Sequence, residues 1–251
     1  MAFDHNDHYH RLLLRQLPAG CRTALDVGCG TGRFARRLAG RGIEVDAVDP
    51  SAEAVEAARA LTGTAGGPGP RFRQADVTRL ELPSGHYDFV SCLASLHHMP
   101  FDTVRTLRAA LAPGGVLVVL GCYPEVSRTD WLWSLAAVPV NAVARLCTAL
   151  GERLRGTRPT GPDAVRAPVA QPTLTYAQTR QEAAALLPGF RLRRLLFWRY
   201  LLVYRAPADG LSPAPTPSPS PSPSPSPSPS PVPSTVRDGG RGAEAPGDRT
   251  A

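Results

Sequence analysis

Residues 25–34 read LDVGCGTGRF, where a buried-strand pattern stops at glycine and a helical pattern begins. The run that stops at the first glycine, TALDVG, is mostly apolar. Phe34, Ala35 and Leu38 follow it at the spacing of one helix face. A strand that runs through glycines into a helix presents backbone N–H groups and the positive end of the helix to a ligand. This stretch therefore predicts a nucleotide-type cofactor site at the carboxyl end of a strand in an α/β fold.

Strand and helix patterns alternate over the first half of the chain. A short amphipathic helix, RLLLRQLP, precedes the first strand, and APGG is expected to form a turn before the fifth. Residues 176–187 form a further helical pattern, and residues 190–207 read as two strands that pair antiparallel. Such alternation is typical of a doubly wound sheet with helices on both faces. The expected strands are TALDVG, IEVDAVD, RFRQAD, YDFVSC and VLVVLGC, with helices at residues 31–39, SAEAVEAARAL and DTVRTLRAAL.

The folded domain is predicted to span residues 1–207. Within it, residues 122–172 contain a Trp-rich apolar segment and several prolines, which we interpret as a helical insertion after the fifth strand. From residue 208 onward a Pro/Ser repeat has almost nothing apolar to bury, so residues 208–251 are expected to be a disordered tail. A chain of 251 residues is long enough for one such domain with a tail.

Composition and targeting signals narrow the class of protein. The formal net charge is +7, and all 28 basic residues are arginine, spread over the predicted helices and strands rather than gathered on one face. This spread argues against nucleic acid as the partner. The amino-terminal residues show no signal-peptide pattern, and the most apolar segment is too short and too polar to cross a membrane. We expect a cytoplasmic protein with no transmembrane segment.

No metal site is expected. The five cysteines include no pair at metal-binding spacing. His5, His8 and His10 are interrupted by an acid and have no downstream partner.

The spacing of the glycines distinguishes between two kinds of cofactor. Gly28, Gly30 and Gly32 give G-x-G-x-G, whereas a dinucleotide loop reads G-x-G-x-x-G and would need glycine where this chain has Arg33. Asp26 lies two positions before the loop, where its carboxylate would repel a pyrophosphate and attract a positive charge. The loop therefore favours S-adenosylmethionine, which carries an ammonium and a sulfonium group, over a nicotinamide dinucleotide.

Two further acids follow the second and third strands. Asp49 closes the second strand, where a carboxylate can accept hydrogen bonds from both hydroxyls of a ribose. Asp76 follows the third strand and could accept from an adenine amino group. An acid at a strand end is often only a helix cap, but the order of Asp26, Asp49 and Asp76 at successive strand ends favours a cofactor site.

These segments resemble the successive motifs of the class I S-adenosylmethionine-dependent methyltransferases, in particular the small-molecule branch with the ubiquinone- and menaquinone-type enzymes. The resemblance covers about residues 23–121 and continues more weakly to residue 207. It implies a Rossmann-like seven-stranded sheet with the last strand antiparallel, and methyl transfer to a small acceptor. The nucleic-acid amino-methylating branch has Asn or Asp followed by two prolines after the fourth strand, where this chain reads CLASLHH. The matching motifs are LDVGCGTGRFARRLA, VDAVDPS, ADVTRLELP, YDFVSCLASLHHM and LAPGGVLVVLG.

The resemblance also implies which residues surround the cofactor. The acid and the glycines of the loop would border its methionine part, with the ribose at the second strand, the adenine at the third and the sulfonium above the fourth. The amino-terminal arm would fold over the cofactor, with His8, Tyr9 and Arg11 in contact with it or with the acceptor. The cofactor-binding residues so implied are Asp26, Gly28, Cys29, Gly30, Gly32, Asp49, Pro50, Asp76, Val77, Cys92 and Leu93, together with Tyr9 and Arg11.

His97 and His98 follow the fourth strand at the cofactor end of the sheet. One of them could line the acceptor pocket and act as a general base, or both could pack against the next helix. Trp131, Trp133 and the apolar residues after them could form the lid of a hydrophobic acceptor pocket, the core of the insertion, or a contact with a membrane surface. The acceptor, the atom methylated and the oligomeric state stay open, as do an RNA or protein substrate and a non-catalytic role.

Overall fold

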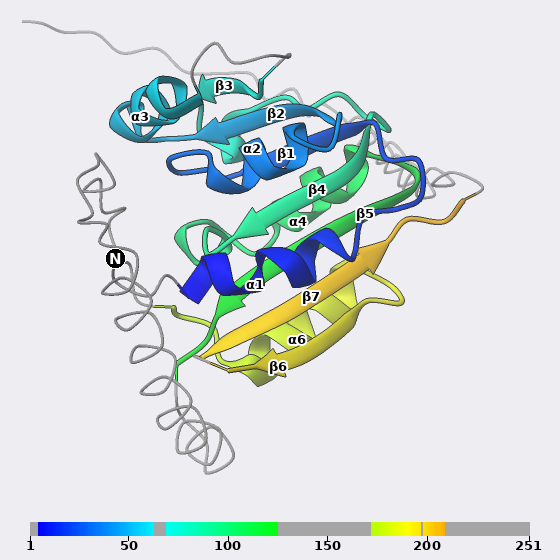
Figure 1. Ribbon diagram of the computed structural model, residues 1–251. Helices are drawn as coiled ribbons and strands as arrows, with labels where there is room; N and C mark the ends of the chain where they lie inside the picture. The colour runs from blue at the N-terminus through cyan, green and yellow to red at the C-terminus, as the bar shows by residue number, and fades with distance from the viewer. Residues whose placement is uncertain (1–4, 63–68, 125–171, 197, 209–251) are drawn as a thin grey trace, which may run out of the picture. The chain divides into compact units, whose positions relative to one another are not determined.

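The computed structural model describes residues 5–62, 69–124, 172–196 and 198–208. Its centre is a seven-stranded sheet of order β3-β2-β1-β4-β5-β7-β6, in which β1 to β5 run parallel and β7 pairs antiparallel with both β5 and β6 (Figure 1). The predicted doubly wound α/β fold with an antiparallel last strand is confirmed. The strands are β1 Thr23–Val27, β2 Glu44–Asp49, β3 Arg71–Gln74, β4 Tyr87–Leu93, β5 Leu111–Cys122, β6 Arg191–Leu195 and β7 Arg199–Arg205.

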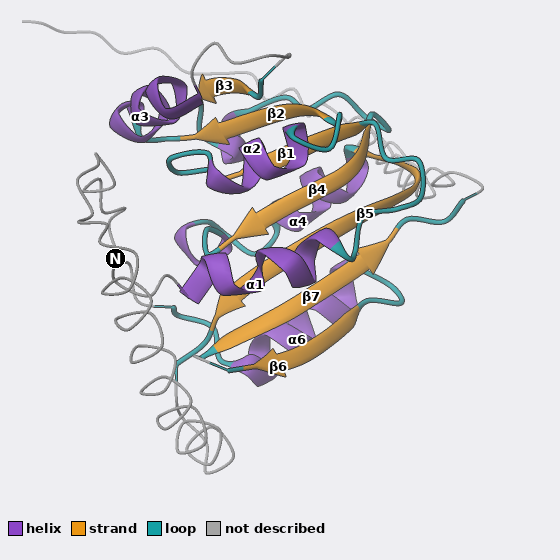
Figure 2. Ribbon diagram, in the orientation of Figure 1, coloured by secondary structure: helices purple, strands orange, loops and turns teal. Residues whose placement is uncertain are grey.

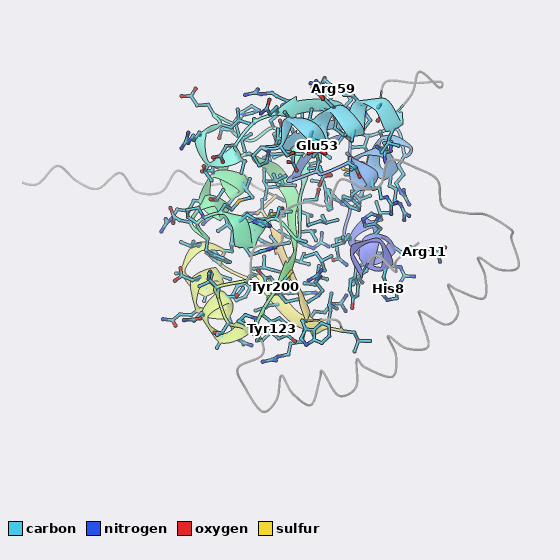
Figure 3. The ribbon with its side chains drawn as sticks, turned by 90° about the vertical axis from the view of Figure 1, so that its left-hand side faces the viewer. His8, Arg11, Glu53, Arg59, Tyr123 and Tyr200 are labelled. Atoms are coloured by element: carbon cyan, nitrogen blue, oxygen red, sulfur yellow. The ribbon has the colours of Figure 1, made fainter. Side chains whose placement is uncertain are left out.

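Helices cover both faces of the sheet (Figures 2 and 3). On one face, α1, α2 and α3 pack in a single hydrophobic cluster with the strands; on the other face, α4 and α6 pack in a second cluster. Two single-turn helices, η1 and η2, follow β3 and β4. The helices are α1 His5–Leu14, α2 Arg33–Ala39, α3 Ala52–Thr62, η1 Val77–Arg79, η2 Leu96–His98, α4 Thr103–Ala109 and α6 Tyr176–Leu186.

The central strands are apolar on both faces because both faces are covered. In β5, residues 116–120 are completely buried. In β1, Ala24 belongs to the cluster under α1 and α2, whereas Leu25 and Val27 belong to the cluster under α4. This alternation fixes which strand residues can meet on each face. It places the side chain of Asp26 on the same face as Ala24.

Two local predictions were wrong. The first helix begins at His5 rather than at residue 11, because Tyr9 and Leu13 provide a buried face for the earlier turns. The APGG segment, expected as a turn, lies inside β5: Tyr87 pairs with Leu111 and Phe89 with Val116, so the extra residues form an irregularity in the strand. Gly114 makes this irregularity possible with a φ of 74°.

Several other predictions fall on residues outside the described ones. Of the predicted insertion at residues 122–172, the structure describes residues 122–124 and 172. The Trp-rich segment and the Pro/Ser tail lie outside the described residues altogether, apart from residue 208.

Candidate functional site

The glycine loop joins β1 to α2 and is tied to the end of β2. The backbone N–H groups of Gly28 and Cys29 both donate to the carbonyl of Val48, at 2.8 and 3.1 Å. Gly28, Gly30 and Gly32 all have positive φ, at 68°, 53° and 74°. The loop therefore curls over the carboxyl ends of β1 and β2, with a backbone conformation that other residues rarely adopt.

The three glycines are required for different reasons. A Cβ on Gly28 would lie 2.7 Å from the hydroxyl oxygen of Ser95, and one on Gly32 would lie 2.5 Å from the ring of Phe72. A Cβ on Gly30 would have nothing within 4 Å. The open space at Gly30 leaves room for a ligand, whereas Gly28 and Gly32 make room for other parts of the protein.

Asp26 is a buried acid with only 2% of its surface exposed. One oxygen, Oδ1, accepts a hydrogen bond from the hydroxyl of Ser91 at 2.7 Å. Burial, with a smaller contribution from the nearby charge of Asp49, raises the pKa of the carboxyl to about 7, although hydrogen bonds from Ser91 and the Ala35 amide act in the opposite direction. A carboxylate in this setting is stabilised by a neighbouring cation, so the site suits an ammonium group.

Asp49 closes β2 beside the loop. Its Oδ2 accepts from the N–H of Gly30 at 2.8 Å, and its Oδ1 accepts from the N–H of Ser51 at 2.9 Å. A carboxylate has about four acceptor positions, so two backbone donors orient the group and leave capacity for two hydroxyls. Its neighbour Pro50 is exposed. Ser51 caps the start of α3, because its hydroxyl accepts from the N–H of Ala54 at 3.2 Å.

Asp76 caps η1. Its Oδ1 accepts from the N–H and the hydroxyl of Thr78, at 2.9 and 2.7 Å, and these bonds hold the pKa of the carboxyl below its ordinary value. The side chain of Val77 is buried in the core, so Val77 presents only its backbone to a ligand. The N–H of Ala75 donates to the carbonyl of Asp49 at 3.0 Å. This bond keeps the end of β3 beside Asp49, the acid predicted to bind the ribose.

Two serines under the loop were not anticipated from the sequence. The hydroxyl of Ser95 donates to the carbonyl of Val27 at 2.7 Å and lies 3.0 Å from the thiol of Cys92. Cys92 is completely buried, and Leu93 is partly buried on the face of α1. The available signal for Ser91 was a polar residue inside an apolar strand. Ser95 lies beyond the strand and carries no such signal.

Cys29 lies within the loop itself. It is partly buried, with its Sγ 3.7 Å from the carbonyl oxygen of Gly30. Burial raises the pKa of its thiol well above the ordinary value. The side chain is therefore a neutral thiol at physiological pH.

His97 and His98 form the end of η2, with ring centroids 4.1 Å apart. His98 is exposed, whereas His97 is partly buried. Burial, with smaller contributions from the charges of His98 and Arg199, lowers the pKa of His97 to about 4. Its Nδ1 is buried and has no hydrogen-bond partner among the residues described. His97 is thus a neutral imidazole near the end of β4.

The amino-terminal helix packs on the sheet with one face and exposes the other. The hydroxyl of Tyr9 donates to the carbonyl of Leu196 at 2.9 Å, which anchors α1 to the connection between β6 and β7. His10 packs against the ring of Phe34, 5.0 Å between centroids. His8 and Arg11 are exposed on the side of α1 turned away from the sheet (Figure 3). The predicted contacts of Tyr9, Arg11 and His8 with a ligand stay predictions.

Aromatic and basic side chains meet near the carboxyl end of β5. The rings of Tyr123 and Tyr176 lie edge to face at 5.7 Å, and the guanidinium of Arg194 lies 4.2 Å from the centre of the Tyr176 ring. Nearby, Arg199 donates from its guanidinium to the sulfur of Cys122 at 2.6 Å. These residues border the edge of the sheet beyond β4, away from the glycine loop.

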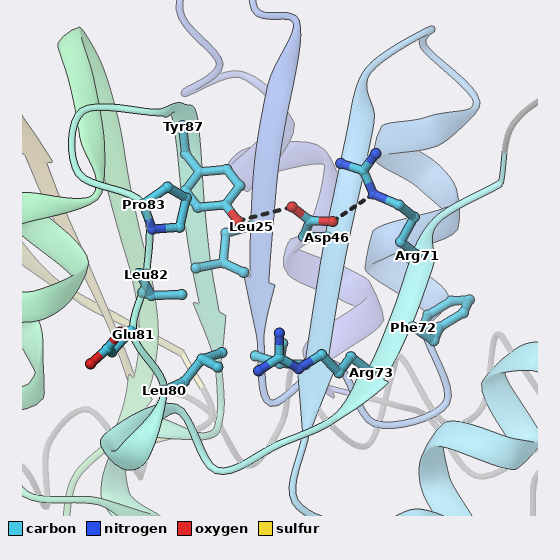
Figure 4. A pocket seen from close by; sticks show the side chains of 11 residues that line it. Leu25, Asp46, Arg71, Phe72, Arg73, Leu80, Glu81, Leu82, Pro83 and Tyr87 are labelled. Atoms are coloured by element: carbon cyan, nitrogen blue, oxygen red, sulfur yellow. Dashed lines mark hydrogen bonds and ion pairs between the residues drawn. The ribbon is translucent and has the colours of Figure 1, made fainter.

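A separate hollow of about 270 Å³ lies beneath β2, on the other face of the sheet from Asp26 (Figure 4). Asp46 accepts there from the hydroxyl of Tyr87 at 2.9 Å and from Nε of Arg71 at 2.7 Å. None of the predicted cofactor residues lines it. The described residues contain no cluster that could hold a metal ion, and no helix among them is long and apolar enough to cross a membrane.

Comparison with known proteins gives concordant results. A methyltransferase domain model matches residues 24–115. An uncharacterized methyltransferase of Mycobacterium bovis is 36% identical over 207 residues, which cover 80% of this chain and 96% of that protein. A ubiquinone biosynthesis O-methyltransferase of Xanthomonas axonopodis pv. citri is 36% identical over 132 residues, which cover 51% of this chain and 53% of that protein.

Solved structures share the fold. The magnesium protoporphyrin IX methyltransferase of Synechocystis PCC 6803, solved with bound SAH, superposes with a TM-score of 0.50 at 21% identity. The match covers 80% of this chain and 81% of that one.

Proposed function

This chain belongs to the S-adenosylmethionine-dependent methyltransferases, and we propose that it transfers the methyl group to a small-molecule acceptor. One relative is named as an O-methyltransferase of ubiquinone biosynthesis, which supports an acceptor of that size, although it matches over about half of each chain. The sequence at the end of β4 and just beyond it, CLASLHH, lacks the Asn or Asp and two prolines expected of nucleic-acid amino methylation.

The observation that carries the assignment of the cofactor site is Asp26. A buried carboxyl with a pKa of about 7 and no cationic partner in the described ranges is suited to an ammonium group supplied from outside. We assign the methionine part of the cofactor to Asp26 and the open space at Gly30, and the ribose to Asp49. The adenine is assigned to the backbone around Asp76 and Val77.

The chemistry requires positioning more than activation. When bound, S-adenosylmethionine supplies a methyl group on a positively charged sulfur, which is a good leaving group. The protein must then hold the acceptor in line and exclude water, and such orientation provides effective molarities of about 10⁵ to 10⁸ M. Leu93, at the end of β4, is partly buried on the face of α1, and we assign it to the apolar side of the space around the sulfonium. A neutral His97 would accept the proton of an acceptor that must lose one.

The cofactor assignment is tested by isothermal titration with S-adenosylhomocysteine, run beside NAD. We expect micromolar binding of S-adenosylhomocysteine alone, weakened at least tenfold in Asp26→Asn and in Asp49→Ala. Asp102→Asn is the matched control, because Asp102 is exposed and pairs only with Arg105 among the described residues. Binding of NAD, or equal affinity in the Asp26 and Asp49 variants, would contradict the assignment.

The acceptor class is tested by methyl transfer from isotopically labelled S-adenosylmethionine. Small-molecule, RNA and protein fractions of a cell extract are offered separately, and we expect the label in the small-molecule fraction. Label in RNA or protein would replace the proposed acceptor class. Cofactor binding without transfer to any fraction would favour a non-catalytic role.

A further inference from the structure

Arg199 lies at the same edge of the sheet as the cofactor residues. It is the first residue of β7 and pairs with Cys122, the last residue of β5. Because β7 runs antiparallel to β5, the beginning of β7 meets the carboxyl ends of the parallel strands. Leu201 and Val203 alternate with Arg199 along β7 and belong to the cluster under α1. The alternation places Arg199 on the same face of the sheet as Asp26.

The guanidinium of Arg199 has few partners for a group that is only partly exposed. One nitrogen donates to the sulfur of Cys122 at 2.6 Å, and a thiol is a weak acceptor. Its Nε is buried and has no hydrogen-bond partner, and no carboxylate in the described ranges forms an ion pair with it. Buried charges in proteins are normally paired. Among the described residues, Arg199 therefore keeps donor capacity that no carboxylate satisfies.

The surroundings of Arg199 favour an anion. Its charge contributes to the lowered pKa of His97, and the charges of Arg199 and Arg193 both act on Tyr9 in the direction that favours a negative oxygen. His97 adds a second buried nitrogen, Nδ1, with no partner among the described residues. Two unsatisfied nitrogen atoms in a positive local field are complementary to a carboxylate or another anionic oxygen group.

The order of the strands sets the distance from the methyl group. The cofactor sulfur is assigned above β4, and β7 lies two places further along the sheet, after β5. Neighbouring strands are about 4.8 Å apart, so the backbone of Arg199 lies roughly 10 Å across the sheet from the end of β4. An acceptor that reaches both places has a length of about one ring plus its substituents.

We propose that the acceptor of this methyltransferase carries an anionic oxygen group, which Arg199 binds beside His97 at the junction of β5 and β7. The proposal rests on the proposed function, because it names the chemical class of the small-molecule acceptor. Arg199 is then a specificity-determining residue: it selects acids over their neutral counterparts and leaves cofactor binding unchanged.

The test uses the full chain saturated with S-adenosylhomocysteine and three matched pairs of probes. The pairs are benzoate and benzamide, 4-hydroxybenzoate and 4-hydroxybenzamide, and hexanoate and hexanamide, titrated calorimetrically. We expect the acid to bind at least tenfold more tightly than its amide in at least one pair. In Arg199→Gln this preference should disappear, whereas Arg205→Gln, at the exposed opposite end of β7, should retain it.

Further variants separate recognition from folding. Arg199→Lys keeps the charge and should retain part of the preference, whereas Arg199→Met keeps the apolar stem and should lose it. Affinity for S-adenosylhomocysteine should be unchanged in all three Arg199 variants. If Arg199→Gln does not fold, the acid preference of Arg199→Lys is compared with that of Arg199→Met, and the difference shows the role of the charge.

The outcomes separate this proposal from the function on which it rests. Absence of an acid preference in all three pairs, or its survival in the variants without the charge, overturns the role of Arg199. Failure of the wild-type chain to bind S-adenosylhomocysteine overturns the cofactor assignment instead. Transfer of label to RNA or protein overturns the small-molecule function, whichever affinities are measured for the acids and amides.

Discussion

The two halves of the carboxyl edge of the sheet differ in how their polar groups are satisfied. Around β1, β2 and β3, the carboxylates of Asp26, Asp49 and Asp76 each accept hydrogen bonds from neighbouring residues. Around β5 and β7, Nδ1 of His97 and Nε of Arg199 are buried and have no partner among the described residues. A site for one fixed cofactor can be oriented by the chain itself, whereas the groups that recognise an acceptor are completed by the acceptor.

The largest expected effect is at the loop, where Gly28→Ala should destabilise the fold. The new methyl group would meet Ser95, and φ is 68°, so we expect a loss of about 2 to 4 kcal/mol. Gly30→Ala, with open space at its Cβ, should lose only about 1 kcal/mol. Urea unfolding measures both. Equal losses would mean that packing does not distinguish the two glycines.

The half of the edge around β5 and β7, which we assign to the acceptor, is probed by His97→Asn. The same substitution at the exposed neighbour, His98→Asn, is its control. If His97 accepts the acceptor's proton, turnover at saturating cofactor should fall by about 10²-fold in His97→Asn and little in His98→Asn. Because its pKa is lowered to about 4, His97 stays neutral down to about pH 5, and its contribution should not change above that pH. Equal turnover in the two variants would leave His97 with a packing role.

Cofactor affinity should depend on pH through Asp26. With its pKa raised to about 7, the carboxyl of the empty site is neutral below that pH, so S-adenosylhomocysteine should bind up to tenfold more weakly per pH unit between pH 7 and pH 5. Titration calorimetry across this range measures the slope, which should be absent in Asp26→Asn. A slope that persists in the variant would assign the proton to another group.

The same shift of the Asp26 pKa affects stability in the opposite direction. The pKa of Asp26 is higher in the folded chain than the ordinary value of 3.8 that applies to the unfolded chain, so folding takes up a proton between these values. The contribution of protonated Asp26 to the free energy of unfolding is therefore lost as pH rises from about 4 to 7. The melting temperature of Asp26→Asn minus that of wild type should therefore be larger at pH 8 than at pH 5. Thermal melts at the two pH values measure this difference. A variant that is less stable at pH 8 would show that the charged carboxylate is compensated by its hydrogen bonds.

The smallest effect is expected at the amino end of α6. Thr175 and Gln178 form a capping box, in which the Thr175 hydroxyl accepts from the Gln178 N–H at 3.2 Å. Thr175→Ala should cost about 1 kcal/mol in urea unfolding. The affinity of this variant for S-adenosylhomocysteine should be unchanged, because α6 packs with α4 on the opposite face of the sheet from Asp26. A weakened affinity would couple the two faces.

The fold and the cofactor half follow from local patterns in the sequence. Apolar runs that stop at Gly28 or Asp49 define strands and their ends, and parallel strands bring those ends together. The packing reason for Gly28 and Gly32 could not be predicted, because Ser95 and Phe72 approach them only in the folded chain. Arg199 reads as one of many arginines until the pairing of β7 with β5 places it beside His97.

The strand order has a consequence for how the chain folds. Because β7, the last of the described strands in sequence, lies between β5 and β6, one edge of β5 stays unpaired until β7 has been synthesised. That edge belongs to a strand whose residues 116–120 are completely buried in the finished fold. The hairpin of β6 and β7 must then dock as a unit over long sequence distances, which slows folding and exposes an aggregation-prone edge in the meantime. A nascent or truncated chain that stops before residue 199 is therefore expected to need protection by chaperones.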